Sequence, residues 1–454
     1  KGPAGAGKTT ITLQFLLAGA ATGEAGLYIG TSETEAEIKS TAASHGWDLE
    51  GVQFRFLEPA GQDEQQSVFH AAEIELPRII ESIFQWVDDV QPIRIVIDSL
   101  AEIRLMAGES SWYRMQLMQL KRRLGEREGA VLLTETVGAA EPLVQSLISA
   151  EIEMNLHVPS FGAMRRRVRV NKIRSRAFLS GYHDYQIVEG GVEVYPRFEP
   201  TTVAESFKAE FASTGIATLD EILGGGMDRG SSHLFYGPTG TGKSSIALRA
   251  VDEAARRGER SAVFCFDERI HTLRLRAKGL GMELEKHLAD GMIRLIPVNP
   301  SEMSAGEFTE WVHRLVGEKD IRYIVLDSLN GYAYAMPEER YLSVHIHEMI
   351  SGLSQRGVTP LLVMAEQENV PFEISYVSDT VLLFQHYEQD GEIRRALAVL
   401  KRRGGAHDRA VHGLRMTGNG IEVSETVFPP EGVFAKKSRI TGRNRYGSRA
   451  GAEQ

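Results

Sequence analysis

The same phosphate-binding pattern occurs twice in this sequence, and this repetition constrains the fold more than any other feature. The pattern G-x-x-x-x-G-K-[ST] occupies residues 2–9 and again residues 237–244. Its glycines let the backbone turn tightly and point N–H groups at phosphate oxygens. Its lysine reaches the β- and γ-phosphates, and its Ser or Thr hydroxyl coordinates Mg²⁺. A glycine-rich turn can match once by chance, but two matches in the same context predict two sites for ATP with Mg²⁺.

Each loop runs into a helical pattern, at 10–18 and at 245–255, so the positive end of a helix dipole should face the phosphates. The nucleotide-binding residues that we predict from the two loops are Gly2, Gly5, Gly7, Lys8, Thr9, Thr10, Gly237, Thr239, Gly240, Thr241, Gly242, Lys243, Ser244 and Ser245. Two of these, Lys8 and Lys243, are also predicted to be catalytic. The hydroxyls of Thr9 and Ser244 are the predicted Mg²⁺ ligands.

Further landmarks repeat at constant spacings, which indicates a tandem duplication. Lys8 and Glu33 each have a match 235 positions later, and Asp98 and Lys172 each have a match 229 positions later. The two spacings describe one domain of about 230 residues that is present twice. The second loop follows an apolar strand pattern at 233–236. The sequence starts within the first loop and lacks an initial Met, so we expect an N-terminally incomplete chain.

Each copy has the alternating strand and helix patterns of an α/β domain. Continuous apolar runs at 93–97 and 323–326 both end in Asp-Ser, and similar runs follow at 130–133 and 360–364. Apolar residues at every position suit strands that are buried on both faces of a parallel sheet. Short strands and turns end each copy. We therefore predict a mainly parallel sheet flanked by helices, with an antiparallel extension at its end.

The predicted domain organisation follows from the repeat. Residues 1–200 should form the first domain, 201–212 a linker, 213–428 the second domain, and 429–454 a basic tail that we expect to be disordered. A chain of 454 residues is too long for a single hydrophobic core, in agreement with two domains. The basic tail is the place where we expect a regulatory protein to bind.

Composition narrows the class of protein. The chain is 42% apolar and 25% charged, and no apolar run approaches the roughly 18 residues of a membrane span. We therefore expect a soluble, cytoplasmic protein without a membrane partner. A net charge of −10 argues against a protein that coats nucleic acid. The single cysteine, Cys265, excludes an intrachain disulfide framework.

Acidic residues follow the apolar strands in both copies. Asp98 and Asp327 stand at strand ends, where open α/β sheets bind ligands, and each carboxylate could hold Mg²⁺. The alternative is an aspartate that caps the next turn. Glu33 and the pair Asp267 and Glu268 end the strand beside the phosphate loop, where a carboxylate can orient or deprotonate an attacking water. The alternative here is a solvated helix N-terminus, where acids are favoured anyway.

A pair of basic residues recurs in both copies, in strand-like segments near their ends. The pairs are Lys172 with Arg174 and Lys401 with Arg403. Side chains at i and i+2 of a strand point to one face, which suits two cations directed at a phosphate. Because each copy already has a phosphate-loop lysine, we predict that each pair acts on the nucleotide of a neighbouring subunit. A solvated basic edge strand is the alternative.

Ser375 precedes a strand pattern and could accept a phosphoryl group. The alternative, which the residues alone favour, is a turn serine. The matching position in the first copy, 229 residues earlier, is Ser146, so a serine here is not peculiar to one domain.

Taken together, these stretches resemble the KaiC family, the duplicated RecA-type ATPases that include the cyanobacterial circadian clock kinase. The resemblance rests on the two phosphate loops and on residues 213–226, 374–383 and 399–408, and it covers the chain apart from the tail. It implies tandem RecA-like P-loop NTPase domains in a double-ring hexamer that binds ATP between subunits. It also implies ATP hydrolysis in the N-terminal ring and Ser/Thr autophosphorylation in the C-terminal ring.

The chain departs from the family at three places. Ser32 precedes Glu33 where the family has paired glutamates, Asp267 replaces one of the pair in the second copy, and Tyr376 replaces one of two adjacent phosphoacceptors beside Ser375. These departures argue against a clock role and leave ATP hydrolysis as the expected activity. Two other readings stay open. One is a RecA-, RadA- or DnaB-type DNA-dependent ATPase, and the other is a nucleotide-gated scaffold with little turnover.

Overall fold

The computed structural model describes residues 1–57, 71–107, 110–136, 142–159, 162–197, 210–299, 301–334, 342–366 and 378–426. It separates into two compact units, Lys1–Arg197 and Phe198–Gln454. The predicted phosphoacceptor Ser375, the predicted tail 429–454 and most of the predicted linker 201–212 lie outside the described residues. In the part of the chain that is described, no helix combines the length and the apolar character needed to cross a bilayer.

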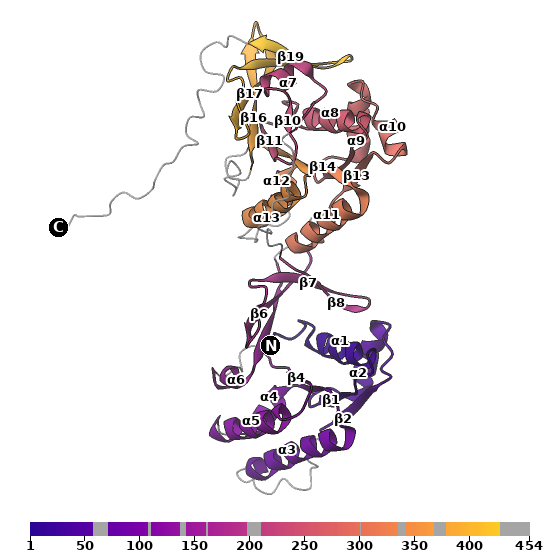
Figure 1. Cartoon of the computed structure of the whole chain (residues 1–454), viewed down its shortest axis with the longest axis vertical. Coiled ribbons are helices and arrows are strands. Elements are labelled where there is room, and N and C mark those ends of the chain that lie inside the picture. The colour runs from indigo at the N-terminus through magenta and orange to yellow at the C-terminus, as the bar shows by residue number, and fades with distance from the viewer. Residues whose placement is uncertain are drawn as a thin grey trace, which may run out of the picture. The chain divides into compact units, whose positions relative to one another are not determined.

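The first unit alternates helices and strands and then ends in strands (Figure 1). Its elements are α1 (Lys8–Ala20), β1 (Gly26–Gly30), α2 (Glu35–Ser44), β2 (Val52–Phe56), α3 (Ala71–Val90), β3 (Arg94–Asp98), α4 (Leu100–Ala107), α5 (Ser110–Gly125), β4 (Ala130–Leu133), α6 (Pro142–Leu147), β5 (Ala150–His157), β6 (Arg165–Ile173), β7 (His183–Val188) and β8 (Gly191–Tyr195).

The second unit repeats this order after a short entry segment. Its elements are β9 (Phe211–Ala212), α7 (Ala217–Ile222), β10 (Met227–Asp228), β11 (His233–Gly237), α8 (Lys243–Arg256), β12 (Arg260–Cys265), α9 (Ile270–Gly279), α10 (Leu284–Ala289), β13 (Ile293–Pro297), α11 (Ala305–Lys319), β14 (Ile321–Asp327), α12 (Leu329–Tyr334), α13 (Leu342–Gln355), β15 (Thr359–Ala365), β16 (Thr380–Gln389), β17 (Glu392–Arg402), β18 (His412–Thr417) and β19 (Gly420–Thr426).

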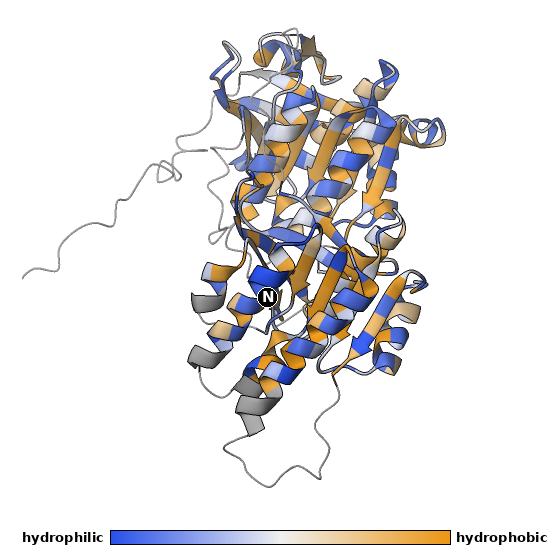
Figure 2. Ribbon diagram, turned by 60° about the horizontal axis from the view of Figure 1, so that its bottom comes forward, coloured by the Kyte–Doolittle hydropathy of each residue, from blue (hydrophilic) through white to orange (hydrophobic). Residues whose placement is uncertain are grey.

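The main sheet of the second unit confirms the predicted α/β fold class. Within the described residues its strand order is β13-β12-β14-β15-β11-β16-β17-β18-β19. The strands from β13 to β16 pair in parallel, and those from β16 to β19 pair antiparallel. Helices α7–α10 pack on one face and α11–α13 on the other. Burial from both sides explains the continuous apolar runs in the central strands, which are visible in Figure 2.

The first unit contains the same strands in two described sheets. The parallel sheet has the order β2-β1-β3-β4, and the antiparallel sheet has the order β5-β6-β7-β8. In the second unit, β11 lies between the strands that match β4 and β5. In the first unit, Lys1 and Gly2 take the position of β11, between the segment that follows β4 and strand β5. The Gly2 N–H donates to the Glu135 carbonyl at 3.0 Å, and the Met154 N–H donates to the Lys1 carbonyl at 2.8 Å.

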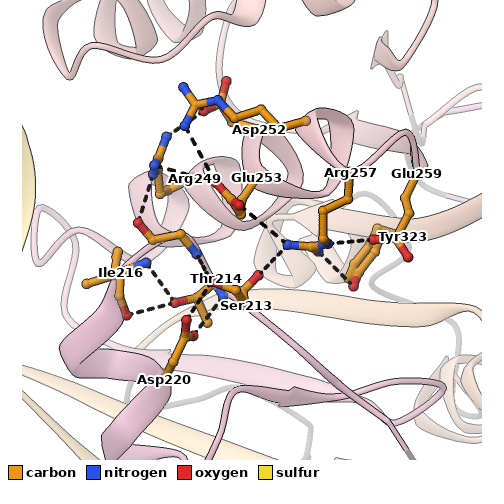
Figure 3. Close-up of polar contacts among 12 residues, drawn as sticks. Ser213, Thr214, Ile216, Asp220, Arg249, Asp252, Glu253, Arg257, Glu259 and Tyr323 are labelled. Atoms are coloured by element: carbon orange, nitrogen blue, oxygen red, sulfur yellow. Dashed lines mark hydrogen bonds and ion pairs between the residues drawn. The ribbon is translucent and has the colours of Figure 1, made fainter.

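The segment that opens the second unit is fixed to the phosphate-loop helix by a polar network (Figure 3). Asp220 on α7 accepts hydrogen bonds from the Ser213 hydroxyl at 2.5 Å and from the Thr214 N–H at 2.7 Å. From α8, Arg249 donates to the Gly215 carbonyl at 3.2 Å, and Arg257, which follows α8, donates to the Ser213 carbonyl at 3.0 Å. The network therefore ties the entry of the chain to the helix that begins at the phosphate loop.

Candidate nucleotide site

The second phosphate loop connects β11 to α8 and has the backbone conformation that its glycines predict. Gly240 and Gly242 have positive φ angles of 82° and 101°, and Gly242 is the N-cap of α8. Because a side chain is strained in this conformation, these two positions favour glycine. The helix begins at Lys243 directly after the left-handed residue, two residues before the sequence-based boundary. Thr239 is exposed at the tip of the loop, whereas Thr241 is buried and donates to the Pro238 carbonyl at 2.8 Å.

Lys243 is buried beneath its own loop, with 5% of its surface exposed. Its Nζ donates to the carbonyls of Gly237 and Pro238 at 2.7 and 2.6 Å. Burial lowers the pKa of Lys243 to about 8, although the negative charge of Asp327 opposes this shift. Burial disfavours the charged form of the lysine, and a nearby anion stabilises that form. A bound phosphate would be such an anion, in agreement with the role predicted for this lysine.

Ser244 and Asp327 meet at the C-terminal edge of the parallel sheet. The Ser244 hydroxyl donates to Asp327 Oδ1 at 3.0 Å. The pKa of Asp327 is raised to about 6, chiefly by burial. The hydrogen bond from Ser244 and the charge of Arg276 oppose the rise, and the neighbouring carboxylates of Glu268 and Asp267 add to it. A cation bound among these three carboxylates would reduce their electrostatic repulsion.

The two adjacent acids after β12 have different partners. Asp267 accepts a hydrogen bond from the Ser328 hydroxyl, at the start of α12. Glu268 accepts one from Arg276 on α9 at 2.8 Å. Both charges act on Asp327, so the structure places the two predicted catalytic acids beside the predicted metal ligand. Sequence reasoning did not identify Arg276, because it comes from the next helix.

The first phosphate loop repeats this arrangement. Gly5 and Gly7 have positive φ angles of 76° and 86°, and Gly7 is the N-cap of α1. The Lys8 Nζ donates to the carbonyls of Gly2 and Pro3, both at 3.0 Å. Burial lowers the pKa of Lys8, while Asp98 and Glu33 oppose the shift. From β7, the Tyr185 hydroxyl donates to the Ala6 carbonyl at 2.5 Å, which ties the loop to the antiparallel sheet.

Thr10 and Ser245, the last predicted residue of each loop, have buried side chains, with 6% and 3% of their surface exposed. Both lie in the first turn of their helices, whose N–H groups have no partner within the helix. These two residues can therefore donate a hydrogen bond to a phosphate through their backbone N–H groups.

Asp98 is the centre of the first site and lies among several hydroxyl groups. Its Oδ2 accepts hydrogen bonds from Thr9 and Tyr28, both at 3.0 Å, and its Oδ1 accepts one from Thr134. Glu33 Oε1 lies 3.1 Å from the same Thr9 hydroxyl. Burial raises the pKa of Glu33, and the charge of Asp98 raises it further. Tyr28 and Thr134 are polar partners that sequence reasoning missed.

The donor groups at both sites fit Mg²⁺. Each site brings a Ser or Thr hydroxyl within 3.0 Å of a strand-end aspartate. Carboxylate and hydroxyl oxygens are the hard ligands that Mg²⁺ prefers. In the first unit, the Thr9 hydroxyl lies within hydrogen-bond distance of the carboxylates of both Asp98 and Glu33, and a cation would balance their negative charge.

The predicted basic pairs lie at the ends of long antiparallel strands. Lys172 Nζ donates to the carbonyls of Gln145 and Ile148 at 2.8 and 2.9 Å, and Arg174 donates to the Ser146 carbonyl at 3.0 Å. The serine that matches Ser375 thus supplies the acceptor for Arg174.

In the second unit, Lys401 Nζ donates to the Ser378 carbonyl at 2.8 Å, and Arg403 forms an ion pair with Asp379 at 3.2 Å. The Arg403 side chain is 54% exposed, so a phosphate from outside the subunit could reach it. Burial lowers the pKa of Lys401, and the charge of Arg403 adds to this shift.

Comparison with known proteins identifies the family of this chain. A family model described as "ATPase: KaiC" matches residues 1–199 and 212–427. The circadian clock oscillator protein KaiC of Synechococcus elongatus is 27% identical over 97% of this chain and 87% of its own length. The corresponding protein of Acaryochloris marina is 25% identical over 96% of this chain and 85% of its own length. KaiC 1 of a Synechocystis species is 26% identical over 94% of this chain and 84% of its own length. With both repeats matched, the chain belongs to the KaiC family of ATPases.

Proposed function

We propose that this protein binds ATP with Mg²⁺ at both phosphate loops and hydrolyses it within a ring of identical subunits, for which the family's hexamer is the expected size. The observation that carries the proposal is the repeated group of a loop lysine that donates to the carbonyls of its own loop, a Ser or Thr hydroxyl and a strand-end aspartate. Membership of the KaiC family supports the same ATP-binding, RecA-like function.

In this proposal, different residues bind the phosphates, hold the metal and activate the water. Loop N–H groups with Lys8 or Lys243 bind the β- and γ-phosphates. Mg²⁺ would be held by Thr9 with Asp98, or by Ser244 with Asp327, and when bound it neutralises phosphate charge. Glu33 in the first site, and Asp267 with Glu268 in the second, orient the attacking water and take its proton. The water oxygen bonds to the γ-phosphorus as the bond to the bridging oxygen breaks.

We place the basic pairs at the neighbouring subunit's nucleotide. Lys172, Arg174, Lys401 and Arg403 lie at strand ends, and the half-exposed guanidinium of Arg403 supports this role. A cation supplied from a neighbour stabilises the charge that develops on the transferred phosphoryl group. In the second unit, Ser375 is the proposed acceptor of a phosphoryl group from ATP, so that an autokinase activity would accompany hydrolysis.

Substitution of the loop lysines tests the proposal. In the full chain, Lys8→Ala and Lys243→Ala should each remove about half of the bound ATP, and the double variant should lose nearly all of it, because each lysine serves one loop. A fluorescent ATP analogue measures binding, and released phosphate measures turnover. Lys39→Ala is the control, since Lys39 is an exposed lysine on α2. ATP binding that survives in the double variant would refute the proposal.

The same incubation with γ-labelled ATP reports phosphoryl transfer. Label on the protein should be lost in Ser375→Ala and in Lys243→Ala but kept in Lys8→Ala. Label that remains at full level in Ser375→Ala would exclude this serine as the acceptor without affecting the ATPase proposal.

A further inference from the structure

The two aspartates that we propose as metal ligands, Asp98 and Asp327, have different surroundings, although their strands match. Three hydroxyls, from Thr9, Tyr28 and Thr134, donate to Asp98. At Asp327, the Ser244 hydroxyl is the counterpart of Thr9. The positions that match Tyr28 and Thr134 are occupied by valines.

Strand register identifies these valines. In the first unit, β1 pairs with β3 so that Tyr28 lies opposite Val96, two positions before Asp98. In the second unit, β12 pairs with β14 so that Val263 lies opposite Val325, two positions before Asp327. Residues two apart on a strand share a face, so Val263 takes the place of Tyr28.

The neighbouring strand shows the same exchange. On β15, Val363 lies directly opposite Asp327. On the matching strand β4, Leu133 lies opposite Ile97, so the next residue, Thr134, takes the place opposite Asp98. Val263 and Val363 are both buried, with 1% and 2% of their surface exposed, and both belong to the apolar core beneath α8. The side of the aspartate that is lined by two hydroxyl groups in the first unit is therefore lined by two valines in the second.

The hydroxyls have a geometric effect on Asp98. Thr134 donates to one carboxylate oxygen and Tyr28 to the other, so the carboxylate is fixed from both sides while Oδ2 also meets the Thr9 hydroxyl. Tyr28 is fully buried and Thr134 is 5% exposed, so neither donor can turn to solvent without repacking. Hydrogen bonds of this kind to a ligating carboxylate orient it, and their loss typically weakens metal binding by about 10- to 100-fold.

We propose that Tyr28 and Thr134 are positioning residues that hold Asp98 for the Mg²⁺ of a bound nucleotide. The first unit therefore binds the metal with its nucleotide more tightly than the second unit does. This inference rests on the proposed function, because it requires that Asp98 is a metal ligand. It predicts a difference in metal affinity between the two sites, although their loop motifs are nearly identical.

The test uses Mn²⁺ as the probe, with its free concentration followed by electron paramagnetic resonance in the presence of a non-hydrolysable ATP analogue. The full chain carries Lys243→Ala, so that the first loop provides the binding site. Thr134→Val, which installs the residue of the second unit, and Tyr28→Phe should each weaken Mn²⁺ binding about tenfold. Thr134→Ser, which keeps the hydroxyl, should restore the parent affinity. Binding of the analogue in EDTA should be the same in all of these chains.

The reciprocal change tests the same idea in the second unit. In a chain that carries Lys8→Ala, Val363→Thr should place a donor beside Asp327 and tighten Mn²⁺ binding several-fold. If the parent chain with Lys243→Ala shows no nucleotide-dependent Mn²⁺ binding, the proposed function of the first unit fails. If that chain binds Mn²⁺ but Thr134→Val and Tyr28→Phe bind it equally well, only the positioning role is overturned. Equal loss in Thr134→Ser and Thr134→Val would likewise show that packing, and not the hydroxyl, is responsible.

Discussion

A single carboxyl group, that of Asp327, links the chemistry of the second site to the stability of its unit. Burial raises the pKa of Asp327 from 3.8 to about 6. A carboxyl whose pKa is raised by folding stabilises the native state at low pH, where it is protonated in both states. That contribution is lost as the pH rises through the folded-state pKa.

We therefore predict how Asp327→Asn changes stability with pH in metal-free buffer. The variant has no charge to bury, so its stability relative to the parent should rise by about 2 kcal/mol between pH 4 and pH 7.5. One pKa unit corresponds to about 1.4 kcal/mol, and a small part of the effect is already present at pH 4. Hydrogen exchange of the β14 amides reports the second unit separately. A stability difference that does not change with pH would show that the buried carboxyl does not titrate in this range.

The residues that sequence reasoning identified belong to recognisable motifs, whereas the residues that it missed, Tyr28 and Thr134, belong to no motif of their own. The phosphate loops and the strand-end aspartates are local patterns, and the structure places Thr9 beside Asp98 and Ser244 beside Asp327. Tyr28 and Thr134 reach Asp98 from two other strands. Their part in the site depends on the strand order β1-β3-β4, which the sequence alone does not specify.

At the scale of elements, α8 is fixed at both ends. Its N-terminus carries the phosphate loop, and its last turns carry Asp252, whose side chain is fully buried. Asp252 accepts hydrogen bonds from Arg249 at 2.6 Å and from the Glu283 N–H at 2.9 Å, and Arg256 lies 3.2 Å away. One carboxylate thus joins α8 to the start of α10, on the same helix that holds the entry segment in Figure 3.

Removal of this carboxylate should be destabilising. Asp252→Ala removes the acceptor that Arg249, Arg256 and the Glu283 N–H share. Both arginines keep Glu253 as an ion-pair partner, so the expected loss is that of buried donors left partly unsatisfied, about 1–3 kcal/mol. Chemical denaturation of the second unit measures the loss. The matched control is Glu285→Ala, which removes the exposed ion pair with Arg274 and should cost no more than about 1 kcal/mol. Similar losses in the two variants would show that the Asp252 network is not tightly coupled.

At the scale of the whole molecule, the duplication gives one chain two candidate nucleotide sites, and the proposed ring would make each site depend on two subunits. A heterologous contact of this kind brings a different surface of each neighbour to the site and closes into a ring. The loop lysine and the basic pair of one site then belong to different chains, which mixing of variants can test.

We predict that two inactive variants restore activity when they assemble together. Both carry Lys8→Ala to silence the first site, one adds Lys243→Ala, and the other adds Arg403→Ala. An arginine of this kind is worth about 10³–10⁵ in rate, so each variant alone should be nearly inactive. Random equal mixing should recover about a quarter of the second-site phosphate release, because a quarter of the contacts then join an intact lysine to an intact arginine. If Arg403 acts within its own subunit, mixing will recover nothing.

The order of strands in the second unit has a mechanical consequence for such a ring. β16 pairs on one side with β11, which leads into the phosphate loop, and on the other side with β17, which ends at Arg402 just before Arg403. The phosphate loop of one site and the arginine proposed to act at the next site are thus carried by neighbouring strands of the same sheet. In the proposed ring, a movement of β11 at one nucleotide site would therefore be transmitted through β16 and β17 to the arginine that we place at the adjacent site.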